Sequence, residues 1–502
     1  MGIDFLLDSH CLGHPYSQQR TPLDLSGFLM TLPLILISII VAVILGFIKH
    51  DRGRSQLLLG ISVIAVFAFQ PELPVRGLDF WLPLGTLGFT TLTWMITTPL
   101  ENRSWNINWP TLTIMVGMVM ALGLTRYLGL SSGLTASRPP QMLQILAGLA
   151  SLSLLGFLMT RFSLPNKMVM TSGLIFIILI FIALKVPIFA QQVSILVRSI
   201  NHQSTNLASP QDFRWLGYSY IAFRLIHTIR DRQGGRLPPV SLAEYITYVI
   251  FFPSLTAGPI DRIERFVGDL RSPAKLSADD FGEAGKRIML GLLKKFVIAD
   301  SLAMIAMNAT NALQVRSAGW AWILLYAFAF QIYFDFSGYT DIAIGLGRLL
   351  GIKLPENFNQ PYLKPNLTQF WNNWHMTLTQ WFRAYYFNPL TRALRAWKKP
   401  ISIPTIILFT QLTTMVLIGL WHGVSVNFVA WGLWHGFGLF VHNRWSDLTR
   451  SSFLKLPLHW QKGLNVGGTL LTFNFISIGW IFFALPRPSI SFHFLQVLFG
   501  LV

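Results

Sequence analysis

The feature that most constrains this chain is a succession of apolar stretches, each about as long as a helix that crosses a bilayer. A hydrocarbon core of about 30 Å requires roughly 20 predominantly apolar residues in a helix. Because short polar loops separate the stretches, neither a single span nor a surface anchor fits the pattern. We expect membrane helices near residues 28–48, 56–69, 81–98, 112–130, 142–159, 169–190, 241–255, 288–307, 320–336, 403–420, 428–442 and 470–485.

The composition points to the same fold class. Hydrophobic residue types make up 52% of the 502 residues and charged types 12%, whereas soluble globular chains carry about 25% charged residues. A soluble fold is therefore not expected. The pattern predicts an all-α, polytopic integral membrane protein with roughly 11 to 13 transmembrane or re-entrant helices around a central tunnel.

The net charge of +18 would suggest a nucleic-acid partner in a soluble protein. Here Lys and Arg fall in loops between apolar stretches, as the positive-inside rule expects, so membrane lipids are the expected partners and nucleic acid is not. Lys49, Arg52 and Arg54 directly follow the first stretch, which predicts a cytoplasmic loop there and an extracytoplasmic N-terminal segment, residues 1–27. That segment lacks the basic region and cleavage site of a secretory signal.

No polar linker is long enough to join two soluble domains, so we expect residues 28–502 to form one transmembrane domain. Cys11 is the only cysteine. The chain therefore has no internal disulfide and no CxxC metal pair, and no cysteine beside the motifs below could act as a nucleophile.

From about residue 191 onward, Pro, Gly and charged residues interrupt the apolar stretches. Irregular backbone at membrane depth persists only where it is buried in protein or lines a watery cavity, so a functional site is expected in this half. The first such segment is FFPSLTAGPIDRIERF, residues 251–266. By itself it is typical of a helix end followed by a turn and an interfacial charge cluster.

The second segment, QIYFDFSGYTDIAIGLG at residues 331–347, places Asp335 and Asp341 inside an apolar stretch. Ionisable groups at that depth are costly and are candidates for function by default. Structural pairing with an arginine such as Arg348 or Arg383 fits the sequence equally well.

Three histidines lie in the remaining unusual segments. His375 lies in FWNNWHMTL, in a stretch too polar and proline-rich for an ordinary span, where an interfacial hydrogen-bonding role is the alternative. His422 and His435 each lie in a WHG sequence beside apolar helices. A neutral histidine can accept a proton near physiological pH, as a general base for a hydroxyl must, although a buried structural histidine is the alternative for both.

A metal site is not expected from these histidines, because no pair has the i, i+4 spacing of HExxH and no cysteine supports them. The phosphate-binding GxxxxGK[ST], the dinucleotide-binding GxGxxG and the GxSxG nucleophile motif are also absent from the sequence. The rival from another class is a transporter or scaffold whose intramembrane Asp and His residues line a path. It predicts inverted repeats, and the sequence has no such symmetry.

Taken in order, the blocks GPIDR, DFSGY, ENFNQPY, FWNNWHMTL and GLWHG resemble the membrane-bound O-acyltransferase family, over about residues 217–440. Its bacterial branch includes the alginate O-acetyltransferase and the D-alanine transferase of teichoic acid synthesis. The resemblance implies that His422 is the catalytic base and His375 a second catalytic residue. It also implies a substrate-binding role for Asn372, Asn373, Trp374, Trp421, Asp335 and His435, with no metal.

The resemblance further implies a multi-pass protein of the inner (plasma) membrane that moves an acyl group, most simply acetyl, to a hydroxyl acceptor in cell-envelope polysaccharide modification. The donor would be a cytoplasmic thioester, either acyl-CoA or an acyl carrier protein, with no bound cofactor. His375, Asn372 and Asn373 would hydrogen-bond the donor or the developing oxyanion. An extracytoplasmic acyltransferase is an implied partner.

Two alternatives within the enzyme class are D-alanyl transfer from a carrier protein and acylation of lipid or protein with a long chain. The sequence differs from the family pattern, which often has arginine near Asn372 and Asn373, aspartate at Ala384 and tryptophan at Val426. These differences bear on the choice of donor and acceptor, and not on the reaction class.

Overall fold

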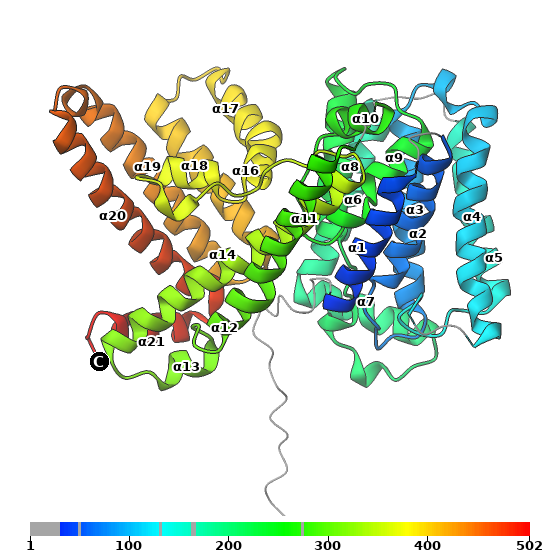
Figure 1. The fold of residues 1–502 in the computed structure, drawn as a ribbon, viewed down its shortest axis with the longest axis horizontal. Coiled ribbons are helices and arrows are strands. Elements are labelled where there is room, and N and C mark those ends of the chain that lie inside the picture. The colour runs from blue at the N-terminus through cyan, green and yellow to red at the C-terminus, as the bar shows by residue number, and fades with distance from the viewer. Residues whose placement is uncertain (1–30, 49–51, 130–132, 162–166, 273–275) are drawn as a thin grey trace, which may run out of the picture.

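The computed structural model describes residues 31–48, 52–129, 133–161, 167–272 and 276–502, and within them it contains helices and no strands (Figure 1). Five helices of this described part are long and apolar enough to cross a membrane, namely α4, α5, α6, α18 and α20. The prediction of an all-α, polytopic membrane protein is confirmed. The predicted N-terminal segment, residues 1–27, lies outside the described residues.

The helices form two groups, which stand side by side in Figure 1. The first group contains α1 (Leu32–Phe47), α2 (Arg52–Ala68), α3 (Leu78–Thr97), η2 (Leu100–Arg103), α4 (Trp105–Leu128), α5 (Met142–Arg161), α6 (Lys167–Lys185), α7 (Pro187–Ile200), η3 (Thr205–Leu207), η4 (Pro210–Asp212), α8 (Tyr218–Gln233), α9 (Leu242–Val249), η5 (Phe252–Ser254) and α10 (Ile263–Arg271). The second contains α11 (Ala278–Leu292), η6 (Leu293–Ala299), α12 (Asp300–Ala303), α13 (Ala309–Gln314), α14 (Ala318–Leu349), η7 (Pro361–Leu363), α15 (Leu367–Asn373), α16 (Met376–Phe382), η8 (Arg383–Phe387), α17 (Asn388–Arg395), α18 (Ile403–His422), α19 (Val426–Leu454), α20 (Leu458–Ala484) and α21 (Pro488–Leu498).

Several expected spans differ from the observed helices. The stretch expected at 169–190 divides at Val186, because Pro187 begins a separate helix, α7. The stretch expected at 241–255 is too short to cross, since α9 ends at Val249 and Pro253 belongs to a 3-10 turn. The stretch expected at 320–336 continues through the DFSGY block to give the 32 residues of α14. Helices α8 and α21 were not expected, because polar residues interrupt their apolar pattern.

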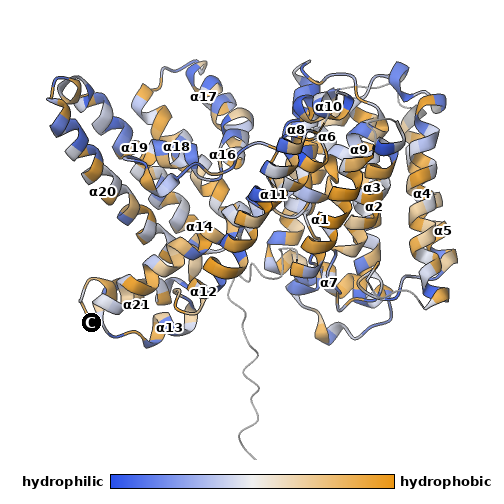
Figure 2. Cartoon of the chain, viewed as in Figure 1, coloured by the Kyte–Doolittle hydropathy of each residue, from blue (hydrophilic) through white to orange (hydrophobic). Residues whose placement is uncertain are grey.

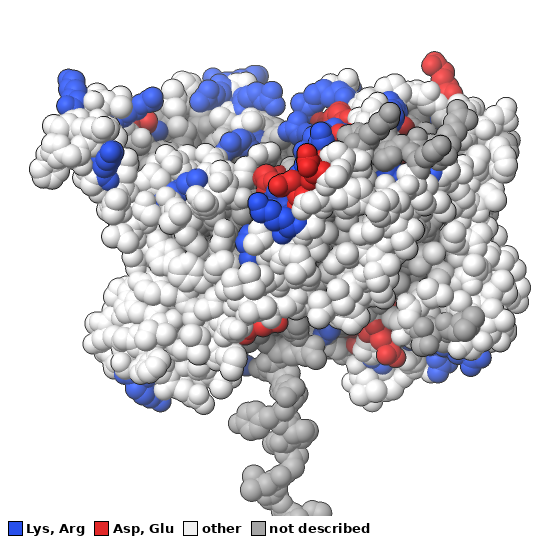
Figure 3. All heavy atoms as spheres, viewed as in Figure 1, with Lys and Arg blue, Asp and Glu red and all other residues white. Residues whose placement is uncertain are grey.

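The hydropathy of the residues varies along the helices as expected for a protein that crosses a bilayer. Apolar residues cover the middle of the helices, and hydrophilic ones gather at the upper and lower edges (Figure 2). In the same orientation Lys and Arg are densest along the upper edge, over α10 and α17 (Figure 3). A bilayer therefore fits between these two edges.

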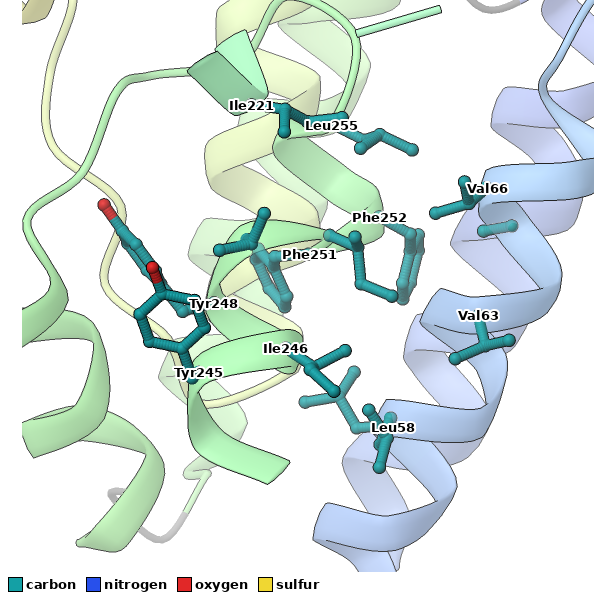
Figure 4. Packing of buried hydrophobic residues seen from close by; sticks show 14 of the residues in the cluster. Leu58, Val63, Val66, Ile221, Tyr245, Ile246, Tyr248, Phe251, Phe252 and Leu255 are labelled. Carbon is teal, nitrogen blue, oxygen red and sulfur yellow. The ribbon is translucent and has the colours of Figure 1, made fainter. Parts of the chain in front are cut away.

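The described helices enclose two large hydrophobic cores, beside a smaller cluster around Val75. In the first, Leu58, Val63 and Val66 of α2 face Ile246 of α9 and Phe252 of η5 (Figure 4). The second is built mainly from α14 to α21 and contains an unusual density of buried tryptophan, including Trp371, Trp374, Trp431 and Trp480.

Helix α14 belongs to both cores. Leu325 and Ile332 in its first half pack in the second core, whereas Ile342 and Leu346 in its second half pack in the first. It therefore joins the two groups of helices as one continuous element.

Helices α11 and α14 cross at very close range, and two glycines make this possible. A Cβ on Gly338 would lie 2.8 Å from the carbonyl oxygen of Gly291, and a Cβ on Gly291 would lie 2.6 Å from the carbonyl oxygen of Gly338. Directly after the crossing the chain enters η6, a π-helical segment. Two residues of η6 pair with carboxylates of α14: Lys294 pairs with Asp341, and Lys295 pairs with Asp335.

Candidate active site

A chamber of about 190 Å³ lies where the two groups of helices meet. Helices α6 and α8 line it from one side, and α14, α15, α16, α18, α19 and α20 line it from the other. Its walls are largely aromatic, and its lining includes Lys185, Trp215, Tyr218, Tyr220, Asp335, Phe336, Trp371, Trp374, His375, Trp421, His422, Trp431, Trp480 and Phe483. The two histidines that the sequence predicted to be catalytic, His375 and His422, lie 47 residues apart in the chain and therefore share one chamber only through the fold.

His422 is the last residue of α18, and it lies in an aromatic cage. Its ring centroid is 4.6 Å from that of Trp421, 4.7 Å from that of Phe483 and 5.9 Å from that of Trp431. Such surroundings hold the imidazole in place and keep bulk water away from it. A neutral imidazole has one nitrogen free to accept a proton.

His375 precedes α16 with left-handed backbone angles, φ 42° and ψ 52°. Its Nδ1 lies 3.1 Å from Oδ1 of Asn357, and the same oxygen accepts hydrogen bonds from the N–H (3.1 Å) and hydroxyl (2.9 Å) of Thr377. The backbone N–H of Thr377 can only donate, so the side-chain oxygen of Asn357, and not its nitrogen, faces these groups. Because an amide oxygen only accepts, Nδ1 carries the proton, and Nε2 is left as an acceptor.

Nε2 of His375 is buried and has no hydrogen-bond partner among the described residues, although the residue lines the chamber. A buried polar atom without a partner is costly, so a substrate group is its natural partner. In this tautomer Nε2 accepts from an N–H or O–H group and has no proton to donate to an oxyanion.

Asp335 lines the chamber and pairs with Lys295, with Oδ1 and Nζ 2.5 Å apart. Asp341 lies outside it and pairs with Lys294 at 2.6 Å and Arg287 at 2.9 Å. Structural pairing with an arginine is thus confirmed for Asp341, through Arg287, but the two arginines named as candidates were wrong. Arg348 pairs with Asp280 on α11, and Arg383 donates to Asn372. Periodicity along one helix carries no information about which basic residue a neighbouring helix supplies.

Of the residues predicted to bind substrate, Trp374, Trp421 and Asp335 line the chamber. Asn372 and Asn373 are not among its lining residues, since the first accepts from Arg383 (2.6 Å) and the second donates to the carbonyl of Gln369 (2.8 Å).

His435 is fully buried, also outside the lining, with its ring 4.9 Å from that of Trp431 and 5.2 Å from that of Trp371. It therefore supports the aromatic wall from behind.

The indole N–H groups were not expected to matter for chemistry. Nε1 of Trp371, Trp421 and Trp431 is buried without a hydrogen-bond partner among the described residues, and all three side chains line the chamber. By contrast, Nε1 of Trp480 donates to the hydroxyl of Tyr362 at 3.1 Å. Three donors are therefore left for groups that enter the chamber.

The GPIDR block closes one edge of the site. Thr256 and Ala257, just before it, line the chamber. Within the block Asp261 binds Arg265 at 2.5 Å and the backbone N–H of Arg262 at 2.6 Å. Burial outweighs these partners and raises the pKa of Asp261 to about 6. The charge cluster therefore orders the turn that follows the lining residues. This agrees with the prediction of a turn and a charge cluster after a helix end.

Two further polar groups at the site were not predicted from the sequence. Asn357, from the ENFNQPY block, orients His375, and Lys185 reaches the chamber from the end of α6. A lysine that ends the most apolar stretch of the chain was a signal that could have been read.

Within the described residues, the atoms of His227, Asp231 and Glu264 lie within 4.8 Å of one another, the spacing of a metal site. Nε2 of His227, however, accepts from the N–H of Ile263, and Nδ1 meets the hydroxyl of Tyr385 at 2.7 Å. Both ring nitrogens thus have protein partners, so this cluster fits a structural network better than a metal site.

Comparison with known proteins agrees with the geometry of the chamber. Residues 175–485 match the model of the membrane-bound O-acyltransferase family. The chain is 32% identical over 286 residues to a teichoic acid D-alanyltransferase of Streptococcus thermophilus, an alignment that covers 54% of this chain and 68% of that protein.

Two other relatives carry different names. A probable alginate O-acetylase of Pseudomonas aeruginosa is 34% identical over 287 residues, which cover 57% of this chain and 51% of that protein, so the chain spans about half of its length. A peptidoglycan O-acetyltransferase of Helicobacter pylori is 29% identical over 470 residues, which cover 88% and 82%.

The family model spans more than half of the chain and includes every residue of the chamber described above. The protein is therefore a membrane-bound acyltransferase, and it belongs to the membrane-bound O-acyltransferase family.

Proposed function

We propose that the protein transfers an acetyl group from a cytoplasmic thioester, acyl-CoA or an acyl carrier protein, to a hydroxyl acceptor of the cell envelope. The observation that carries this proposal is the chamber with largely aromatic walls that His375 and His422 share. Its volume of about 190 Å³ is below the roughly 300–1,000 Å³ of pockets for drug-sized ligands. A short acyl group therefore suits it better than a long chain.

In the proposed reaction His422 removes the proton from the acceptor hydroxyl as its oxygen attacks the thioester carbonyl. The new C–O bond forms, the C–S bond breaks, and the proton on His422 passes to the departing thiolate. His375 accepts a hydrogen bond from a substrate N–H or O–H and so fixes its position. The aromatic walls exclude water that would otherwise hydrolyse the thioester.

D-Alanyl transfer is the second candidate, and the similarity to the Streptococcus thermophilus protein favours it. Mass spectrometry of envelope polymers distinguishes the two candidate functions. It compares a deletion strain with the same strain after complementation. Loss of acetyl ester supports the first proposal, and loss of alanyl ester supports the second. An unchanged content of both esters would contradict both.

The carbonyl oxygen of the thioester becomes negatively charged during attack, and we propose that indole N–H groups stabilise it. Trp421→Phe should lower the transfer rate about 10²-fold, because it keeps the aromatic surface and removes one donor of an oxyanion site. The rate is measured with purified protein and acetyl-CoA. Trp480→Phe is the matched control, since that N–H is already bound to Tyr362. Equal rates for Trp421→Phe and the parent would contradict the assignment.

We further propose that the protein lies in the inner (plasma) membrane with its basic upper edge in the cytoplasm (Figure 3). In a Cys11→Ser background, a membrane-impermeant maleimide added to intact cells should label Ser9→Cys and not Arg52→Cys. Lysed cells, in which both positions react, provide the control for reactivity. Labelling of position 52 alone in intact cells would reverse the orientation.

A further inference from the structure

We propose that a lateral groove between α3, α4 and α5 binds one anionic phospholipid, with its phosphate at Arg103 and an acyl chain along α4. The groove is separate from the chamber of the two histidines, since no described residue lines both. Apart from Leu242, its lining also lies outside residues 175–485, which match the family model. The lipid site is therefore independent of the proposed acyl transfer.

The groove has the size and the surface of a site for an acyl chain. Its volume is about 780 Å³, within the roughly 300–1,000 Å³ of typical ligand pockets. The side chains that line it are mostly apolar and include Leu84, Leu87, Met95, Leu112, Val116 and Leu152. Two polar side chains of the lining already have protein partners, because Trp94 donates to the carbonyl of Val240 (3.0 Å) and Asn108 to that of Ser104 (2.9 Å). An apolar guest therefore suits these walls.

The groove is open where α4 and α5 separate, and it is closed where they meet. A Cβ on Gly123 of α4 would lie 2.5 Å from Cδ1 of Ile145 on α5, so the two helices touch there. Nearer the start of α4, a Cβ on Gly117 would meet no atom of the described residues within 4 Å, although Gly117 lines the groove. Helix α5 stays packed on α3, where Leu152 lies 2.9 Å from a Cβ built on Gly88. The opening therefore lies between α4 and α5.

The length of the groove corresponds to one leaflet of a bilayer. Its lining on α4 runs from Asn108 to Val119, which at 1.5 Å per residue spans about 17 Å. Half of the hydrocarbon core is about 15 Å thick. A transmembrane helix of a partner protein needs roughly 20 residues and would extend well beyond the groove. A phospholipid, whose chains occupy a single leaflet, matches this length better.

Positive charge lies at the mouth of the groove. Arg103, in η2 just before α4, lines the groove, and its Nε donates to the carbonyl of Thr98 at 2.9 Å, which holds the side chain in place. Burial and then the nearby charge of Arg232 lower the pKa of Arg103. A bound phosphate would offset the repulsion between the two guanidinium groups, whose planar geometry suits phosphate oxygens.

The mouth of the groove lies on the basic side of the membrane. Helix α3 begins beside α7 at the lower edge, where Val197 packs against the cluster that contains Leu78, and it ends beside η2 at the upper edge (Figure 1). The upper edge has the densest Lys and Arg and is the one proposed to be cytoplasmic (Figure 3). Since the cytoplasmic leaflet carries the negative surface potential, charge and position select an anionic phospholipid of that leaflet.

The test measures lipid binding to delipidated full-length protein by native mass spectrometry. Dioleoyl phosphatidylglycerol is compared with dioleoyl phosphatidylcholine, which has the same chains and a zwitterionic headgroup. The parent should bind one phosphatidylglycerol about tenfold more tightly, as a charge-assisted hydrogen bond predicts. Arg103→Gln should reduce that preference to about one. Arg395→Gln, at an exposed position of α17 on the same edge, is the matched control and should keep the preference.

Filling the groove tests its position without changing any charge. Gly117→Leu places a side chain in the open part of the groove and should weaken the binding of both lipids at least tenfold, because displacing two buried methylene groups is enough for that loss. Gly467→Leu is the matched control and should bind as the parent does. It lies at an exposed position of α20, where a Cβ likewise meets no described atom within 4 Å.

Several outcomes would overturn the site. Equal binding of the two lipids by the parent, or an unchanged preference in Arg103→Gln, would contradict the anionic class. If Arg103→Gln does not accumulate, Arg103→Met replaces it. Unchanged lipid binding in Gly117→Leu would contradict the location. Release of a copurifying membrane protein by Gly117→Leu, with lipid binding intact, would instead assign the groove to a protein helix.

Discussion

Replacing His422 with alanine should remove most acyl transfer while leaving insertion and folding unchanged. General-base catalysis contributes about 10² to 10⁴ in rate, and His422, at the end of α18, lines the chamber at the position that the family resemblance implies for the base. The side chain makes ring contacts but no hydrogen bond on which another described residue depends. Initial rates with acetyl-CoA, normalised to protein level by immunoblot, measure the effect.

Further histidine variants separate the base from its neighbours. His375→Ala should also impair transfer, by less, because His375 positions a substrate group instead of moving the proton. Groups that act as a unit are non-additive, so the double variant should be little worse than His422→Ala. His435→Ala should be milder, since this ring lies behind the wall. A well-expressed His422→Ala protein with full activity would contradict the assignment of His422 as the base.

Replacing Asp335 with asparagine should destabilise the protein by about 3–5 kcal/mol, because it leaves Lys295 as an uncompensated charge. Both side chains are largely shielded, with relative exposures of 8% for Lys295 and 15% for Asp335. Unfolding in mild detergent, followed by heating or by denaturant titration, measures the change. Stability is the proper readout, since Asp335 also lines the chamber and its loss would affect activity directly.

Removal of both charges provides the internal control. Asp335→Asn combined with Lys295→Met should recover most of the lost stability, as buried pairs often tolerate joint replacement. The exposed pair of Arg444 and Asp447 gives the matched surface control, and Asp447→Asn should change stability by no more than about 1 kcal/mol. Equal losses of stability in Asp335→Asn and Asp447→Asn would show that the intramembrane pair contributes no more to stability than the surface pair.

The sequence predicted the fold class and the pair of histidines, for different reasons. Long apolar stretches identify membrane helices directly, since the bilayer allows almost no other backbone structure. His375 and His422 were assigned to one site by resemblance to a family, because nothing in either segment predicts that residues 47 apart lie in the same chamber. The structure adds the physical link, a chamber whose walls come from both groups of helices.

What periodicity could not provide is the identity of partners between helices. Asp335 and Asp341 were noticed because an ionised carboxylate inside a membrane is energetically costly. The lysines that pair with them, Lys295 and Lys294, are adjacent residues of the π-helical segment η6, and each binds a different carboxylate. Likewise Asn357 is one polar residue among many in its loop, and only the fold reveals that it sets the tautomer of His375.

The continuity of α14 through both cores bears on whether the two groups of helices can move relative to each other. Proteins that work by alternating access rock one bundle against the other around a central site. Here such rocking would have to bend α14 beside Gly338, where it is locked against Gly291 at van der Waals contact. The close packing of Gly338 on Gly291 opposes such bending, so we expect the walls of the chamber, which come from both groups of helices, to keep their arrangement through the proposed reaction.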